Sequence, residues 1–162
     1  MPARRVLESS LAIAGADRLV VVENLQAAES VNAARPDLPI IYTAGVPGVA
    51  ALEVISETAA QVATAGGRVA VASDADLGGV RIASRVADAV TAAGAALDVI
   101  DCGTADHDPR PRFGAPTLRH LGELASEQSP LTPTIRAFAA AVHRRGYPVE
   151  QELAVTDAVL AW

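Results

Sequence analysis

The chain lacks lysine altogether, so all 13 of its Lys and Arg positions are arginine, against 19 Asp and Glu. The formal net charge is −6 at pH 7. Nonspecific affinity for DNA comes largely from cations that neutralise phosphates, so this balance argues against a stand-alone DNA-binding module. It does not argue against a catalytic domain that other protein parts deliver to DNA. A concentrated acidic site is what a divalent cation requires.

Cysteine, aromatic residues and long apolar runs are also scarce. Cys102 is the only cysteine, which excludes a disulfide framework or a cysteine-based zinc site within one chain. Aromatic residues make up 3%, which disfavours an aromatic stacking platform for single-stranded nucleic acid. No apolar run approaches about 18 residues, and the first residues are polar. We therefore expect no membrane span, no signal peptide and a cytoplasmic location.

Short β-branched runs alternate with longer alanine-rich patterns of helical period. Strands buried on both faces are predicted over residues 19–22, 39–42, 68–72 and 97–100. Helices are predicted over residues 3–14, 24–34, 49–65, 78–93, 118–128, 134–145 and 148–162. This order predicts an α/β fold, a mainly parallel four-stranded sheet with helices on both faces. We expect an N-terminal helix within residues 1–15, and one domain over 16–162 that ends in extra helices.

Three carboxylates follow predicted strands. Glu23 comes directly after the first strand, and Asp74 and Asp76 come after the third. Ligands in parallel sheets bind beyond the carboxyl ends of the strands. Carboxylates at i and i+2 on an extended segment point the same way, with Cα atoms about 6–7 Å apart. The pattern predicts a site for Mg²⁺ or Mn²⁺, which prefer oxygen ligands. Each residue taken alone is also a candidate helix N-cap. Because clustered carboxylates repel, we expect a cation among them.

Four stretches in order carry a family resemblance: VVVEN (20–24), YTAGVPGVAALEVI (42–55), SDADLGGVRIASRV (73–86) and RRGYPVEQE (144–152). The chain resembles the Toprim domain shared by topoisomerases, bacterial primases, OLD-type nucleases and relatives of the topoisomerase VI A subunit. It is more similar to the C-terminal Toprim domain of JetD-like subunits of Wadjet plasmid-defence systems. The resemblance runs from about residue 19 to the end of the chain.

The resemblance implies a Rossmann-like Toprim fold and a Mg²⁺- or Mn²⁺-dependent DNA endonuclease within a plasmid or phage defence complex. Glu23, Asp74 and Asp76 would be its catalytic metal ligands, with Glu150 and Glu152 as further ligands. The sequence alone would place the last two in the first turn of a helix. DNA and other complex subunits, or an additional N-terminal DNA-binding domain, are the implied partners. A homodimer remains open.

Tyrosine chemistry is not expected of this chain by itself. In topoisomerase VI-like enzymes a separate helical domain supplies a catalytic tyrosine, and no stretch of this sequence corresponds to it. Tyr42 and Tyr147 are interpreted as structural. Hydrolysis by a metal-activated water therefore fits better.

Arginines supply the secondary candidates. Arg81 and Arg85 share one helix face and are candidates for contacting DNA phosphate, although solvent exposure or pairing with Asp88 explains them equally well. Arg110 and Arg112 lie in a long loop over residues 101–117, where a solvated loop is the alternative to a DNA contact. Gly79 is expected to allow a tight backbone turn after the acidic residues.

Other functional classes stay open or are disfavoured. A non-catalytic Toprim-like module that docks partners is the main alternative. A haloacid-dehalogenase-like phosphatase is disfavoured, because the DxD motif follows the third strand and no lysine is present. A dinucleotide-binding enzyme is disfavoured because no G-x-G-x-x-G follows the first strand.

Overall fold

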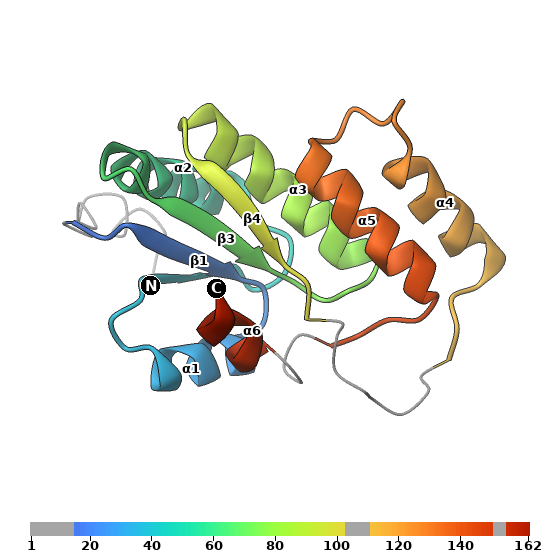
Figure 1. The fold of residues 1–162 in the computed structure, drawn as a ribbon, viewed down its shortest axis with the longest axis horizontal. Helices are drawn as coiled ribbons and strands as arrows, with labels where there is room; N and C mark the ends of the chain where they lie inside the picture. Colours follow the sequence, from blue (N-terminus) through green and yellow to red (C-terminus); the bar gives the residue numbers. More distant parts are fainter. Residues whose placement is uncertain (1–14, 103–110, 151–154) are drawn as a thin grey trace.

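The computed structural model describes residues 15–102, 111–150 and 155–162. Within these residues, four strands form one parallel sheet in the order β2-β1-β3-β4 (Figure 1). The strands are β1 (Arg18–Val22), β2 (Ile40–Tyr42), β3 (Arg68–Ala72) and β4 (Ala96–Ile100). The predicted α/β fold is confirmed, and the carboxyl ends of all four strands lie at one edge.

The register of β1 on β3 decides which residues share that edge. Val22 pairs with Ala72, so the next residue along each strand begins the connection at the same level. The Glu23 N–H donates to the Ala72 carbonyl at 3.2 Å, which continues the pairing one residue beyond the strand. The acidic residues that follow β1 and β3 are thereby brought side by side.

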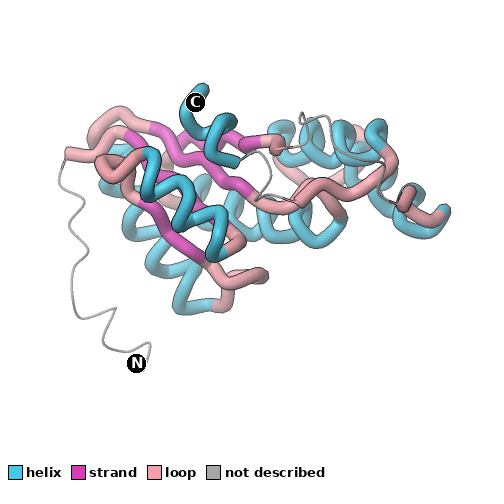
Figure 2. Tube along the Cα trace, turned by 90° about the horizontal axis from the view of Figure 1, so that it is seen from below, coloured by secondary structure: helices cyan, strands magenta, loops and turns pink. Residues whose placement is uncertain are grey.

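The described part of the chain has six helices: α1 (Leu25–Ala34), α2 (Val49–Thr64), α3 (Leu77–Ala92), α4 (Ala115–Ala125), α5 (Pro133–Arg145) and α6 (Val155–Ala161). Helices α2 and α3 cover one face, and α1 and α6 the other (Figure 1). The paired helices α4 and α5 extend beyond the β4 side of the sheet, next to α3 (Figure 2). In the parts of the chain that the structure describes, no helix is long and apolar enough to cross a membrane.

Alternation along the two central strands builds a core on each face, because successive side chains of a strand point to opposite sides. The face toward α2 and α3 receives Leu19, Val21, Val69 and Val71. The face toward α1 and α6 receives Val20, Val22, Ala70 and Ala72. Helices α4 and α5 add Leu121, Ile135, Phe138, Ala139 and Val142 to the first core. The near-continuous apolar strands of the sequence are thus explained by helices on both faces.

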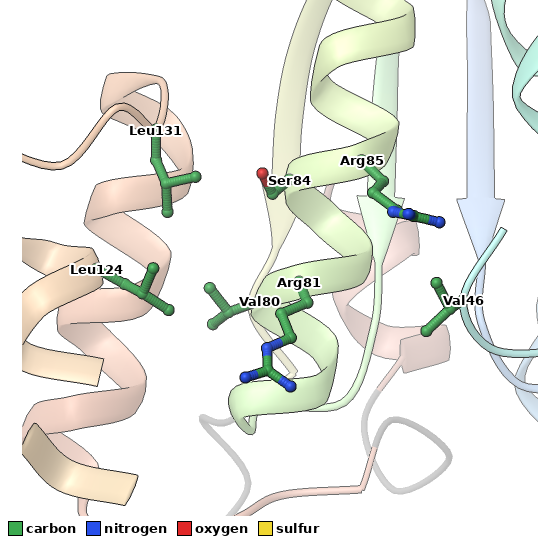
Figure 3. A pocket seen from close by; sticks show the side chains of 7 residues that line it. All are labelled: Val46, Val80, Arg81, Ser84, Arg85, Leu124 and Leu131. Atoms are coloured by element: carbon green, nitrogen blue, oxygen red, sulfur yellow. The ribbon is translucent and has the colours of Figure 1, made fainter. Parts of the chain in front are cut away.

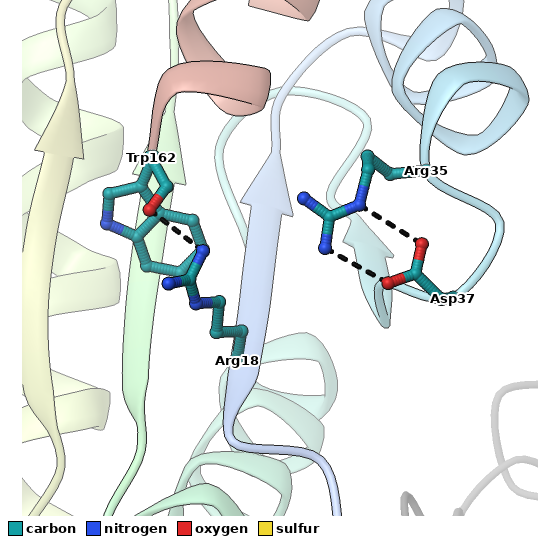
Figure 4. Close-up of polar contacts among 4 residues, drawn as sticks. All are labelled: Arg18, Arg35, Asp37 and Trp162. Carbon is teal, nitrogen blue, oxygen red and sulfur yellow. Dashed lines mark hydrogen bonds and ion pairs between the residues drawn. The ribbon is translucent and has the colours of Figure 1, made fainter.

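The C-terminal end of the chain is fastened to the amino ends of the strands. The Arg18 guanidinium lies 5.4 Å from the centre of the Trp162 ring and donates to the Trp162 carbonyl at 2.8 Å (Figure 4). The Trp162 indole N–H donates to Asp98, which also accepts from Arg68 at 2.7 Å. A local ion pair between Arg35 and Asp37 closes the turn after α1 (Figure 4). The contacts of Trp162 with Arg18 and Asp98 hold the end of α6 against the sheet.

Two predicted elements differ in extent by more than one residue. Helix α4 begins at Ala115 rather than at 118, because Pro116 suits the first helical turn. It ends at Ala125, so the prediction of helix is wrong for residues 126–128. The prediction of a helix from residue 148 is wrong for residues 148–150, which are not helical. Gly146 ends α5 with a left-handed φ of 77°, and the chain then crosses the sheet edge as an extended segment. The predicted helix over residues 3–14 lies outside the described residues, so the proposed division at residue 15 stays a prediction.

The packing of α6 predicts a position-dependent loss of stability. Val159 is buried against α1, whereas its neighbour Leu160 is 52% exposed. Val159→Ala should lower the free energy of unfolding by about 1–2 kcal/mol, because it removes two buried carbons and leaves a cavity. Leu160→Ala is the matched control and should change it by less than about 0.5 kcal/mol. Urea unfolding measures both, and equal losses would contradict the placement of α6.

Candidate functional site

Glu23 and Asp74 meet at the carboxyl edge of β1 and β3. The Asp74 backbone N–H donates to Glu23 Oε2 at 3.1 Å. Both residues line a pocket of about 370 Å³, together with Asn24, Tyr42 and Gly45. We call this pocket the acidic cleft. Two residues predicted from separate strand ends therefore share one site.

Asp76 lies in the same cluster but has a second task. It is the N-cap of α3, and its Oδ1 accepts from the Gly79 N–H at 2.8 Å. The N-cap interpretation is therefore correct for this residue. Its charge nonetheless acts on Glu23, because Asp76 is among the carboxylates that raise the pKa of Glu23. One side chain thus fixes the start of α3 and adds negative charge to the cluster.

Glu150 reaches the cluster through the extended segment that follows α5. The Ala75 N–H donates to the Val149 carbonyl at 2.8 Å, which places the C-terminal segment against the backbone between Asp74 and Asp76. The Glu150 charge is close enough to raise the pKa of Glu23. Glu152 lies outside the described residues.

The pKa of Glu23 is raised above its ordinary value of 4.5. Burial of the carboxyl is the largest cause, and the charges of Asp74, Asp76 and Glu150 add to it. The hydrogen bond from the Asp74 N–H opposes the rise. The ionised site is therefore electrostatically unfavourable by itself, and a bound cation would relieve it.

Two charged residues of the edge were missed by the sequence analysis. Asp101 follows β4, and Arg145 at the end of α5 contacts both of its carboxylate oxygens, at 3.0 and 2.8 Å. Burial raises the pKa of the Cys102 thiol to about 12, helped by the charges of Asp101 and Asp74 and opposed by that of Arg145. This places all three charges around Cys102. Asp101 could have been found by the strand-end rule that found Glu23.

Arg145 is a cation at the same edge, where it pairs with Asp101. The expectation of a cation among Glu23, Asp74 and Asp76 stays a prediction. The Arg145 side chain is 12% exposed, and its Nη1 is buried without a hydrogen-bond partner among the residues that the structure describes. An unsatisfied buried donor costs about 1–3 kcal/mol, so such groups call for an explanation. A buried donor beside an acidic cluster fits a site that receives an anion as well as a cation.

Gly79 is required by close backbone contact. A Cβ on Gly79 would lie 1.8 Å from the Asp74 carbonyl oxygen, far inside van der Waals contact. The Ser73 hydroxyl donates to the Gly79 carbonyl at 3.1 Å and fastens the same turn. The glycine of the DxDxxG stretch therefore lets α3 begin directly against the acidic loop.

Three of the four candidate arginines, Arg81, Arg85 and Arg112, do not line the acidic cleft. Arg81, Arg85 and Arg112 are exposed, and Arg110 lies outside the described residues. Arg85 donates to the Pro47 carbonyl at 3.1 Å, and no ion pair joins it to Asp88 within the described chain. Arg81 and Arg85 line a second pocket beside α3.

The cluster suits a divalent cation in charge and in ligand type. Carboxylate oxygens are the ligands that Mg²⁺ and Mn²⁺ prefer. As the side chains stand in residues 15–102, 111–150 and 155–162, no group of three or more His, Cys, Asp or Glu is arranged to hold a metal ion. Asp76 is turned toward the helix start and Glu23 toward the Asp74 N–H. Binding would therefore require these side chains to rotate.

Fold and site together define a parallel α/β domain with an acidic cluster at the carboxyl edge of its central strands. The chain belongs to the family described as "Protein of unknown function C-terminus (DUF2399)", whose match covers residues 1–160. Comparisons with curated proteins and with solved structures returned no match.

The close contact at Gly79 predicts a strong asymmetry between adjacent glycines. Gly79→Ala should lower the free energy of unfolding by about 1–3 kcal/mol, because the backbone of Asp74 would have to move. Gly78→Ala is the control, since its Cβ would meet no backbone and only a side-chain oxygen of Asp76 at 3.1 Å. That change should stay within about 1 kcal/mol. Thermal unfolding in a chelator measures both variants.

The raised pKa of Glu23 predicts a pH-dependent gain from removing its charge. A carboxyl whose pKa is higher in the folded than in the unfolded state contributes stability below about pH 4.5 and loses that contribution as pH rises through the folded pKa. Glu23→Gln should therefore raise both the melting temperature and the free energy of unfolding at about pH 7 in EDTA. The gain in free energy should be less than about 1 kcal/mol, since the site is half solvated. The gain should vanish near pH 4. A gain that is constant with pH would contradict this electrostatic account.

Proposed function

We propose that the chain is a Toprim-type, metal-dependent DNA endonuclease domain of a plasmid or phage defence complex, related to JetD-like Wadjet subunits. One observation supports this most: Glu23, Asp74, Asp76 and Glu150 converge at one sheet edge, and the last three raise the pKa of the first. Structural acidic residues on a protein surface have no reason to gather in this way, because their mutual repulsion costs stability.

Each residue of the cluster would have a distinct role in a metal-dependent nuclease site. Glu23, Asp74, Asp76 and Glu150 would hold Mg²⁺ or Mn²⁺, which supplies an activated water and neutralises charge on the phosphate. The Asp74 N–H orients the Glu23 carboxylate. The N-terminus of α3 points its positive end toward this edge, which favours a phosphate there. Arg145 adds a fixed positive charge behind Asp101.

The charge of the chain indicates how DNA would reach this site. With a net charge of −6, the domain alone has little nonspecific attraction for DNA. Other subunits of the complex, or another domain of a longer protein, would then supply most of the DNA affinity. Membership in the DUF2399 family supports comparison with the JetD-like proteins that the sequence resembles.

Isosteric substitutions test the proposal. Asp74→Asn and Asp76→Asn should each reduce Mn²⁺-dependent nicking of plasmid DNA by at least about 100-fold, because the metal loses an anionic ligand. Asn is also a good N-cap, so Asp76→Asn should keep its fold. Asp88→Asn, on an exposed position of α3, is the control and should nick normally. Unchanged nicking in both site variants would sink the assignment.

A non-catalytic docking module is the second candidate. It is favoured by the use of Asp76 as an N-cap, which occupies one oxygen of the cluster. Calorimetric titration with Mn²⁺ separates the two functions. Saturable binding that Asp74→Asn abolishes supports the nuclease. Absence of binding up to millimolar Mn²⁺ supports the docking module.

A further inference from the structure

A second pocket of about 380 Å³ lies beside α3 (Figure 3). Residues of α3, of the segment after β2, and of the α4–α5 region line it: Val46, Val80, Arg81, Arg85, Leu124 and Leu131. We call it the arginine pocket. Figure 3 shows Leu124 and Leu131 facing Val80 from one side, and Val46 standing on the other side of α3.

The arginine pocket combines an aliphatic floor with a cationic rim. Val80 is buried, and Leu124 and Leu131 are half-buried against the core. Arg81 is exposed and has no hydrogen bond or ion pair with any residue that the structure describes. Arg85 uses one N–H on the Pro47 carbonyl, and a guanidinium has five N–H donors. The pocket therefore suits a ligand that has both an apolar body and negative charge.

One loop forms a wall of both pockets. Ala44 and Gly45 line the acidic cleft, and the next residue, Val46, lines the arginine pocket. Ala44 and Gly45 take left-handed φ values of 57° and 86°, which turn the chain sharply between the two. The Gly45 N–H donates to the Glu23 carbonyl at 3.3 Å. The two pockets therefore lie on either side of this loop, with Gly45 lining one and Val46 the other.

The spacing along α3 suits a nucleic-acid strand. Arg81 follows the N-cap Asp76 by five residues, which is about 7.5 Å of helix rise. Arg85 is one turn further, about 6 Å along the same face. The two guanidinium groups thus lie at increasing distances from the acidic cluster along α3, and their spacing along the helix is similar to that of successive phosphates in one nucleic-acid strand.

We propose that the arginine pocket binds one unpaired nucleotide of the DNA strand that enters the acidic cleft, with phosphates on Arg81 and Arg85 and the base against the aliphatic floor. This inference rests on the proposed nuclease function and names its substrate: single-stranded or locally unpaired DNA. An intact duplex keeps its bases stacked and presents phosphates, sugars and base edges rather than the face of a base, which leaves the apolar floor unused. The scarcity of aromatics is consistent with a single base pocket rather than a stacking platform.

Binding without cleavage tests the proposal. The probe is a fluorescent single strand of about 12 nucleotides, compared with the duplex of the same sequence, in EDTA. The full chain should bind the single strand several-fold more tightly. Arg81→Gln should weaken this binding about fivefold at 0.1 M salt and reduce the salt slope by about 0.7, the value of one phosphate contact on a single strand. Arg119→Gln, an exposed arginine of α4 outside the pocket, is the control and should keep the slope.

A second pair of variants tests the apolar part. Val46→Ser should weaken single-strand binding about twofold to threefold and leave duplex binding unchanged. Val49→Ser is its control, because Val49 is 75% exposed and lines neither pocket. Equal affinity for duplex, or an unchanged slope in Arg81→Gln, would overturn the proposal and favour a polypeptide occupant. Binding of a free deoxynucleoside monophosphate as tight as that of the strand would overturn it too.

The two proposals fail in different ways. If the chain binds the single strand but shows no metal-dependent nicking, the nucleotide pocket is supported and the nuclease function is contradicted. If the chain nicks duplex plasmid in a way that depends on Asp74 but does not bind the single strand, the nuclease function is supported and the nucleotide pocket is contradicted.

Discussion

In-register pairing of β1 and β3 is the constraint on which the site depends. It sets Val22 level with Ala72, so the residues that directly follow β1 and β3 begin at the same level of the sheet edge. A slip of one residue would turn each side chain to the opposite face and would separate Glu23 from Asp74. The register is secured by buried valines on both faces of the sheet, so the core and the site are specified by the same pairing.

Electrostatic repulsion at this edge is held in check by backbone donors and by one cation. Glu23 accepts from the Asp74 N–H, Asp76 accepts from the Gly79 N–H, and Asp101 is paired with Arg145. The first two bonds come from peptide groups whose positions the fold fixes. They do not neutralise the charge, and the pKa of Glu23 stays raised. The protein therefore keeps an unfavourable charge cluster that a divalent cation would stabilise, which is the pattern of a binding site rather than of a solvated surface.

The features that could be predicted from the sequence are those that depend on neighbouring residues, namely the strands, the strand ends and the helix N-cap. Apolar runs identified all four strands, and the strand-end rule brought Glu23 together with Asp74. The double role of Asp76 was also foreseeable, because an Asp before a helical pattern is a candidate N-cap. Arg145 and Glu150 could not be placed in the same way, since both reach the edge from a helix end and a segment far along the chain. Their positions depend on how α5 packs, and tertiary packing leaves no local pattern in the sequence.

The segment from Arg145 to Glu150 shows how compactly such a tertiary position can be encoded. Arg145 pairs with Asp101 at the last turn of α5, and Gly146 then ends the helix in a left-handed conformation. The chain runs extended to Val149, whose carbonyl accepts from Ala75 inside the acidic loop. Glu150 follows directly, and its charge helps to raise the pKa of Glu23. The late RRGYPVE run is therefore more than a helix boundary, because it brings the C-terminal part of the chain to the acidic cluster that follows β1 and β3.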